Sequence, residues 1–210
     1  THDQSSAASD VYKRQLRYVK KPHQNDGGLK MLNGNIGKCV AKISAVKEQF
    51  RYIKAKTLVF DDQEEVKKAY EKGKLNRNVI IVVRNQGPKA NGMPELHSLT
   101  PMLSNVQDLG FKVALLTDGR MSGASGKILA AIHVTPEAID NGVIGKIEDD
   151  DEIEIDANKG KLNILTDISK RKNSLLNDMK KNQSFGRNIF NTLRIHSQGS
   201  EEGGGIKLID

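Results

Sequence analysis

The sequence predicts a mixed α/β domain in which a small, curved or barrel-like β-sheet is flanked by helices and followed by a helical tail. Two apolar runs, VIIVV at residues 79–83 and VALL within the segment KVALL at 112–116, are typical of interior strands buried on both faces. Amphipathic helical patterns precede and separate these runs, and an alternating hairpin pattern follows at 153–164. Such an order fits a mixed sheet covered by helices.

The first half of the domain is predicted to contain two strands and a helix. The core begins at Leu29, one strand is expected over residues 40–46, and a second lies within 52–60, which is rich in β-formers. Residues 63–73, QEEVKKAYEKG, follow a pair of aspartates and space their apolar residues on one helical face. Gly73 is expected to end this helix.

The second half is predicted to contain two capped helices and the hairpin. The Thr-Pro pairs at 100–101 and 135–136 each match an N-cap followed by proline at the first helical position. Gly110 and Gly142 are expected to end these helices, and the Asn-Lys-Gly turn at 158–160 separates the hairpin strands.

Changes in composition divide the chain into three parts. Residues 1–15 are polar and aperiodic, as in a disordered or foreign tail; residues 16–165 form the predicted barrel domain. Residues 166–210 are expected to form a helical tail with a flexible end, including a charged helix over 167–181 and a glycine-rich run at 199–205.

Composition excludes several function classes. No stretch approaches the ~18 apolar residues of a membrane span, so a cytoplasmic protein with no membrane partner is expected. The net charge of +7 is compatible with nucleic acid, but the lysines are scattered and lack interleaved aromatic residues, so no nucleic-acid partner is expected. Cys39 is the only cysteine, which excludes an internal disulfide; its apolar surroundings predict a buried, inert thiol.

The segment LTDGRMSGASGK, residues 116–127, ends like a nucleotide-binding loop but fails that template. The template requires glycine at position 121 and serine or threonine at 128, where this chain has Met121 and Ile128. Its glycines and cationic residues still allow backbone N–H groups to converge on an anion. The residues alone leave two interpretations: an anion- or oxyanion-binding loop, or a tight turn with serine caps.

A second loop, residues 84–101, follows the VIIVV strand and has a backbone fixed by Gly-Pro, Asn-Gly and Met-Pro steps. Glu95 could bind a hard cation such as Mg²⁺, and His97 could act as an acid, a base or a donor to substrate. The alternative for both residues is a solvent-facing surface role.

Three segments of the chain resemble one enzyme family. The sequences GPKANGMPELHSLTP (87–101), LTDGRMSGASGK (116–127) and AAIHVTPEA (130–138) resemble, in this order and spacing, the C-terminal part of the phosphogluconate dehydratase branch of the dihydroxyacid and sugar-acid dehydratase superfamily. The likeness runs from about Leu16 to near the end of the chain.

This resemblance implies a fold and a reaction. The fold would be a small mixed β-barrel of the swivelling-domain type, flanked by helices. The reaction would be that of a hydro-lyase that removes water from 6-phospho-D-gluconate and gives 2-dehydro-3-deoxy-6-phosphogluconate in the Entner–Doudoroff pathway. In the family, an iron–sulfur cluster acts on the departing hydroxyl, and Mg²⁺ holds the carboxylate end of the substrate.

The resemblance also implies roles for individual residues. Ser122 matches the proposed base, and Glu95 matches the metal-binding glutamate of the Met-Pro-Glu loop. A serine alkoxide needs cationic neighbours, and Arg120 could supply one.

Substrate contacts are expected from the remaining polar residues of the two loops. They are Arg120, Ser125, Lys127 and His97. Lys127 is expected to meet the phosphate because of its charge.

The chain departs from the family in what it lacks. The cluster-binding cysteines and the remaining metal ligands belong to an N-terminal domain, and Cys39 does not stand at one of their positions. The chain is therefore expected to be a C-terminal fragment that is inactive alone, with its own N-terminal domain as partner and a homodimer as assembly.

Residues 149–151, Asp-Asp-Asp, are expected to form a solvated acidic turn. The alternative functions are a non-catalytic anion-binding module and an interaction domain.

Overall fold

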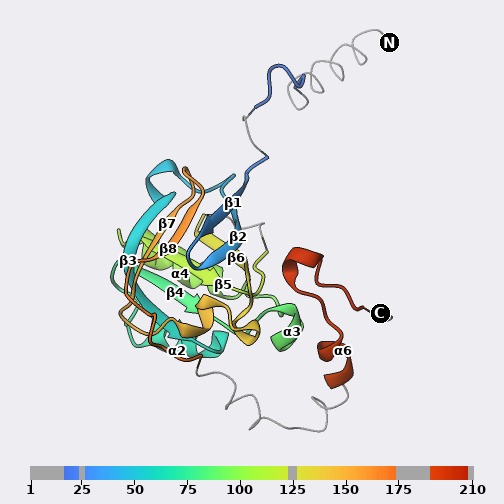
Figure 1. Ribbon diagram of the computed structural model, residues 1–210. Coiled ribbons are helices and arrows are strands. Elements are labelled where there is room, and N and C mark those ends of the chain that lie inside the picture. Colours follow the sequence, from blue (N-terminus) through green and yellow to red (C-terminus); the bar gives the residue numbers. More distant parts are fainter. Residues whose placement is uncertain (1–16, 24–26, 123–126, 174–189, 208–210) are drawn as a thin grey trace, which may run out of the picture.

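Eight strands close into a barrel in the computed structural model, which describes residues 17–23, 27–122, 127–173 and 190–207 (Figure 1). In chain order the strands are β1 (Leu29–Gly34), β2 (Gly37–Lys42), β3 (Tyr52–Phe60), β4 (Val79–Val83), β5 (Val113–Thr117), β6 (Leu129–Thr135), β7 (Glu152–Asp156) and β8 (Lys161–Ile164). The helices are α2 (Gln63–Glu71), α3 (Pro88–Asn91), α4 (Leu99–Asp108) and α6 (Asn191–Ile195), with 3-10 turns η1 (Glu48–Phe50), η3 (Ala138–Asp140), η4 (Val143–Lys146) and η6 (Ser200–Glu202).

The barrel is half parallel and half antiparallel. Around the ring the strands run β1-β2-β6-β5-β4-β3-β7-β8, and the neighbours β3, β4, β5 and β6 pair in parallel. Parallel neighbours need crossover connections, and α2 lies in the β3–β4 crossover and α4 in the β4–β5 crossover, whereas β1–β2 and β7–β8 are hairpins. The ring closes where Asn33 of β1 pairs with Lys161 of β8. These features confirm the predicted mixed, barrel-like α/β fold.

Two apolar clusters flank the parallel strands, and β4 belongs to both. Ile80 and Val82 point into the barrel interior, and Val79, Ile81 and Val83 pack on the other side in the cluster that includes α2 and α4. All five side chains are fully buried, which confirms the interior strand predicted from this run.

The helices lie outside the barrel and are short. The longest in the described part of the chain, α4, has 10 residues. Helix α2 contacts α4, while α3 contacts α6 of the C-terminal tail on another side of the barrel (Figure 1). In the described part of the chain, no helix has both the length and the apolar character needed to cross a bilayer.

The strand and helix predictions of the first half are confirmed for β3 and α2. Asp62 caps α2 by accepting the N–H of Glu64 at 2.8 Å, and Gly73 has a positive φ of 69° just after the helix. The strand expected over residues 40–46 instead ends at Lys42, because the chain turns between the buried side chains of Ile43 and Val46.

Two strands, β1 and β6, were not predicted. In β1 only Leu32 is fully buried, whereas Leu29 and Met31 are exposed. The apolar residues of this strand therefore do not mark the face that packs on the core. Strand β6 begins two residues after Lys127, at the end of the glycine-rich segment that the sequence predicts only as a loop.

Neither Thr-Pro pair starts a helix in the way predicted. Helix α4 begins earlier, with Ser98 as its N-cap residue, and Thr100 is buried inside it with its hydroxyl 3.3 Å from Sδ of Met121. The Thr135–Pro136 peptide bond is cis at the end of β6, and a 3-10 turn follows in place of an α-helix.

The region after β8 also differs from expectation. Residues 167–173 are not helical, and the rest of the predicted helix over 167–181 lies outside the described residues. Arg171 pairs instead with Asp151, which is buried, so the prediction of a solvated acidic turn is wrong for that residue. The glycine-rich stretch 199–205, expected to be flexible, contains η6.

Candidate active site

The two motif loops predicted to carry chemistry lie side by side at the carboxyl ends of β4 and β5. These strands are parallel neighbours, so the loops that leave them emerge at the same edge of the sheet. The loops are also joined directly, since Glu95 forms an isolated parallel bridge with Arg120 and the N–H of Leu96 donates to the carbonyl oxygen of Arg120 at 3.2 Å.

Three of the predicted site residues meet at this junction. The backbone N–H of Ser122 donates to Oε1 of Glu95 at 2.6 Å. A guanidinium nitrogen of Arg120 lies 3.7 Å from Oε2 of Glu95, and Nε of Arg120 donates to the carbonyl oxygen of Met93 at 2.8 Å. The side chain of Glu95 is 36% exposed and that of Arg120 is 52% exposed, so both remain accessible to a ligand.

Two of the remaining predicted residues, His97 and Lys127, are described at other positions in the two loops. His97 is exposed in the turn before α4, and Lys127 is exposed just ahead of β6. Ser125 lies outside the described residues. The structure therefore brings together Glu95, Arg120 and Ser122.

Asp118, which the sequence analysis did not single out, organises the base of both loops. It is fully buried at the end of β5 and accepts the backbone N–H groups of Asn85, Gln86 and Ala138 at 2.8–3.1 Å. Burial raises the pKa of Asp118, and the backbone donors act against that rise. An aspartate directly after a buried strand and before glycine was the only signal for this role in the sequence.

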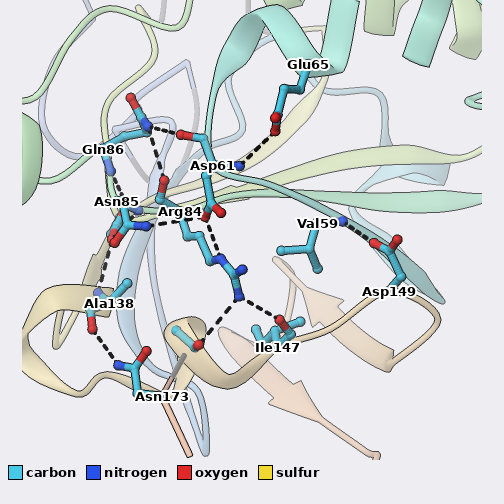
Figure 2. Close-up of polar contacts among 12 residues, drawn as sticks. Val59, Asp61, Glu65, Arg84, Asn85, Gln86, Ala138, Ile147, Asp149 and Asn173 are labelled. Atoms are coloured by element: carbon cyan, nitrogen blue, oxygen red, sulfur yellow. Dashed lines mark hydrogen bonds and ion pairs between the residues drawn. The ribbon is translucent and has the colours of Figure 1, made fainter. Parts of the chain in front are cut away.

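A second polar network fixes the ends of β3 and β4 (Figure 2). Nε of Arg84 donates to Oδ1 of Asp61 at 2.7 Å, and another of its nitrogens donates to the carbonyl oxygen of Ile147 at 3.0 Å. The side-chain amide of Gln86 donates to the carbonyl oxygen of Asp61 at 2.8 Å. The loop after β4 therefore leaves from a rigid base.

Two further titratable residues near the site come from the β6 region. Burial and the charge of Arg120 lower the pKa of His133, whose backbone N–H donates to the carbonyl oxygen of Gly119 at 2.9 Å. Burial, together with the charges of Asp118 and Asp140, raises the pKa of Glu137 to about 7. Both residues fall inside the segment AAIHVTPEA, but the burial and charges that shift their pKa values come from residues distant in the sequence.

Glu95 fits a magnesium ligand, although only as one member of a set. Mg²⁺ is commonly bound through one or two carboxylates and keeps several waters, which a partly exposed glutamate allows. Within the described residues, no three His, Cys, Asp or Glu side chains are grouped as a complete metal site. A set of three or more such side chains would therefore need members from outside those residues.

The chain does not fit an iron–sulfur cluster. Such clusters are held by cysteine thiolates, and this chain has one cysteine. Cys39 is 2% exposed in the barrel core, and burial raises its pKa to about 12, so it is a neutral thiol. The prediction that Cys39 is buried is confirmed.

Comparison with known proteins points to one family. A family model described as the dihydroxy-acid/6-phosphogluconate dehydratase C-terminal domain matches residues 14–204. A phosphogluconate dehydratase of Helicobacter pylori strain J99 is 48% identical over 203 residues, which is 92% of this chain and 33% of the relative.

Two further relatives carry the same name. Phosphogluconate dehydratase of Rhizobium meliloti is 50% identical over 194 residues, covering 91% of this chain and 32% of the relative. That of Zymomonas mobilis is 55% identical over 150 residues, covering 71% and 25% respectively. The chain thus spans about a third of the length of the first relatives it matches.

Proposed function

Because the chain belongs to the dihydroxy-acid/6-phosphogluconate dehydratase family and matches the model of its C-terminal domain, we propose that it is the C-terminal part of a phosphogluconate dehydratase. This hydro-lyase would eliminate water from 6-phospho-D-gluconate and form 2-dehydro-3-deoxy-6-phosphogluconate, a step of the Entner–Doudoroff pathway. The observation that carries the proposal is the hydrogen bond between Ser122 and Glu95, which joins the two motif loops at one edge of the barrel.

Ser122 is the proposed base. A serine hydroxyl is a weak base at neutral pH, so its alkoxide must be stabilised by nearby positive charge. Arg120 lies two residues earlier in the same loop; its side chain is 52% exposed, and its guanidinium lies 3.7 Å from Oε2 of Glu95. This arrangement supports a serine that is activated by its surroundings and positioned by its own backbone.

The proposed reaction is a proton abstraction followed by loss of water. Ser122 removes the proton from C2, and the electron pair of that C–H bond forms the C2–C3 double bond. The C3 hydroxyl takes up a proton and departs as water. The resulting enol tautomerises to the 2-keto product.

Glu95 is the proposed magnesium ligand. Its two oxygens already fix Ser122 and approach Arg120, so the metal-binding group and the base would be held in one geometry. Mg²⁺, when bound, supplies positive charge beside the carboxylate of the substrate. The iron–sulfur cluster implied by the family is proposed to be held outside this chain, since Cys39 does not fit it.

Substrate binding is proposed for Arg120 and for further polar residues of the two motif loops. The phosphate and carboxylate of 6-phosphogluconate are both anionic, and Arg120 and Lys127 are the cationic groups of this loop. Ser125 and His97 are proposed to add hydrogen bonds. The full enzyme is proposed to act in the cytoplasm as a homodimer, with the N-terminal domain completing the site.

Replacing Ser122 by alanine in a full-length dehydratase containing this sequence tests the proposal. Turnover of 6-phosphogluconate to the 2-keto product should be abolished, while the absorption of the iron–sulfur cluster is unchanged. Ser169→Ala, at an exposed serine after β8, is the matched control and should keep full turnover. Substantial activity in Ser122→Ala would contradict the assignment of the base.

The 210-residue chain alone provides a second test. It should give no 2-keto product, because one carboxylate and one serine do not complete the site. Turnover by the isolated chain would contradict the proposed division of the active site between two domains.

A further inference from the structure

Glu137 is a buried carboxylate beneath the segment that leads to Glu95. Its residue is 1% exposed, and its Oε2 accepts the backbone N–H of Lys89 at 3.2 Å. The backbone of Ala90 also donates to it. A Cβ at Gly87 would overlap this carboxylate, so glycine at that position lets the segment lie directly on Glu137.

The segment held by Glu137 is the one that delivers two contacts to the site. Helix α3 starts at Pro88, and the N–H of Met93 returns to the carbonyl oxygen of Gly87 at 3.3 Å. Met93 then accepts from Arg120, and Glu95, two residues further, accepts from Ser122. A shift of α3 would therefore move both acceptors.

The turn that carries Glu137 also holds the second loop. The N–H of Ala138, the next residue, donates to Oδ2 of Asp118 at 3.1 Å, and Asp118 lies two residues before Arg120. The side chain of Glu137 thus fixes the loop after β4, while the adjacent backbone fixes the loop after β5. A single turn after β6 sets the position of one loop relative to the other.

The carboxylate of Glu137 has a role besides filling space in the core. Among the described residues, Oε1 of Glu137 is buried without a hydrogen-bond partner. Leaving a buried polar atom unpaired destabilises a fold, and an apolar side chain would avoid that cost. An apolar residue at this position could not accept hydrogen bonds from the two backbone N–H groups that Glu137 binds.

We propose that Glu137 is a positioning residue, which holds the Gly87–Asn91 segment in the place from which Met93 and Glu95 reach Arg120 and Ser122. The inference rests on the proposed function of this site. It assigns no contact between Glu137 and substrate.

Amide hydrogen exchange of the 210-residue chain tests the proposal without any need for turnover. In Glu137→Ala, the amides of Lys89 and Ala90 should exchange at least about tenfold faster, because their acceptor is gone. The amides of Leu96 and Ser122 should accelerate as well, since they bridge the two loops. The amide of Leu162, in the β7–β8 hairpin, should be unchanged.

Conservative variants separate positioning from general stability. Glu137→Gln keeps an acceptor oxygen, so all four loop amides should stay protected from exchange. Glu137→Asp has a shorter side chain that places its carboxylate further from these amides, so their protection should be partly lost. Asp140→Asn is the matched control: it removes the ion pair with the Lys89 side chain at 2.8 Å and should leave Leu96 and Ser122 unaffected. Should Glu137→Ala fail to fold, the Gln and Asp variants still give the comparison.

Two results would overturn the inference. One is acceleration confined to Lys89 and Ala90, which would show a purely local role. The other is equal acceleration of the loop amides and Leu162, which would show a loss of global stability. Either result would leave the proposed role of Ser122 intact, whereas turnover by Ser122→Ala would overturn the assignment of the base and leave the positioning role of Glu137 standing.

Discussion

Oε1 of Glu95 accepts the backbone N–H of Ser122 at 2.6 Å, so the proposed metal ligand and the proposed base are joined without an intervening side chain. The bond runs between loops that leave neighbouring parallel strands, 27 residues apart in the chain. Any change at Glu95 is therefore felt at Ser122 in two ways, through charge and through position.

Substitutions at Glu95 should separate these two effects. Glu95→Gln keeps an oxygen for the Ser122 amide but removes the charge, so in the full-length enzyme it should weaken Mg²⁺ binding at least about tenfold while the protein stays folded. Glu95→Ala should also free the Ser122 amide, which would appear as faster exchange at that position. Magnesium titrations of both variants, with exposed Glu64→Gln on α2 as control, measure the difference. Unchanged Mg²⁺ affinity in Glu95→Gln would contradict the metal assignment.

The pH dependence of stability should carry a contribution from Glu137. Its pKa is raised from 4.5 to about 7, so between these values the folded chain keeps a proton that the unfolded chain has released. The stabilisation is complete below pH 4.5 and is lost as pH rises through 7, by up to about 3 kcal/mol at about 1.4 kcal/mol per pKa unit.

Comparison with Glu137→Gln isolates this contribution. The lowered pKa of His133 acts in the opposite direction, since its stabilisation is lost as pH falls, but it is common to both proteins. The free energy of unfolding of the native chain, relative to the variant, should therefore fall between pH 4.5 and 7, as measured by urea denaturation. A constant difference across this range would contradict the raised pKa.

Asp118 should contribute strongly to stability. Its carboxylate accepts three backbone N–H groups from two separate segments, and removing it leaves buried donors unpaired. Asp118→Ala is expected to lower the free energy of unfolding by about 2–4 kcal/mol. Urea denaturation provides the measurement, with exposed Asp108→Ala at the end of α4 expected to change it by less than about 0.5 kcal/mol. A similarly small effect at Asp118 would show that the donors find other partners.

Cys39 should be unreactive in the folded chain. With a pKa of about 12 it is ionised in roughly one molecule in ten thousand at pH 8, and it is 2% exposed. Thiol reagents should therefore modify it only in denaturant. In a full-length enzyme, Cys39→Ala should leave the iron–sulfur absorption unchanged, whereas its loss would mean that this cysteine supports the cluster.

The parts of the fold that the sequence predicts are those in which local pattern and burial agree. The buried run of β4 and the capped helix α2 carry their signals within a few residues. Strand β1 does not, because Leu29 and Met31 face outward. The Thr-Pro pairs have the composition of helix starts, but tertiary packing buries Thr100 inside α4 and ends β6 at Thr135.

The site shows the same division. Resemblance to a family marks Glu95, Arg120 and Ser122, and the structure brings these three together. Asp118 and Glu137 escape prediction because their roles depend on backbone N–H groups 32 and 48 residues away. A sequence motif therefore marks the exposed residues of the two loops more readily than the buried residues that hold the loops in place.

The closure of the barrel at Asn33 and Lys161 has a thermodynamic consequence. One backbone pair forms the ladder at this seam, and the side chain of Asn35 adds two hydrogen bonds of 2.8 Å to the backbone of Ile164. Because the β4–β5 ladder is longer, local opening should begin at the seam at a lower free energy than global unfolding. Around the ring, that seam lies diametrically opposite the β4–β5 pair. Local opening at the seam can thus leave the β4–β5 edge of the barrel, where the two motif loops meet, unchanged.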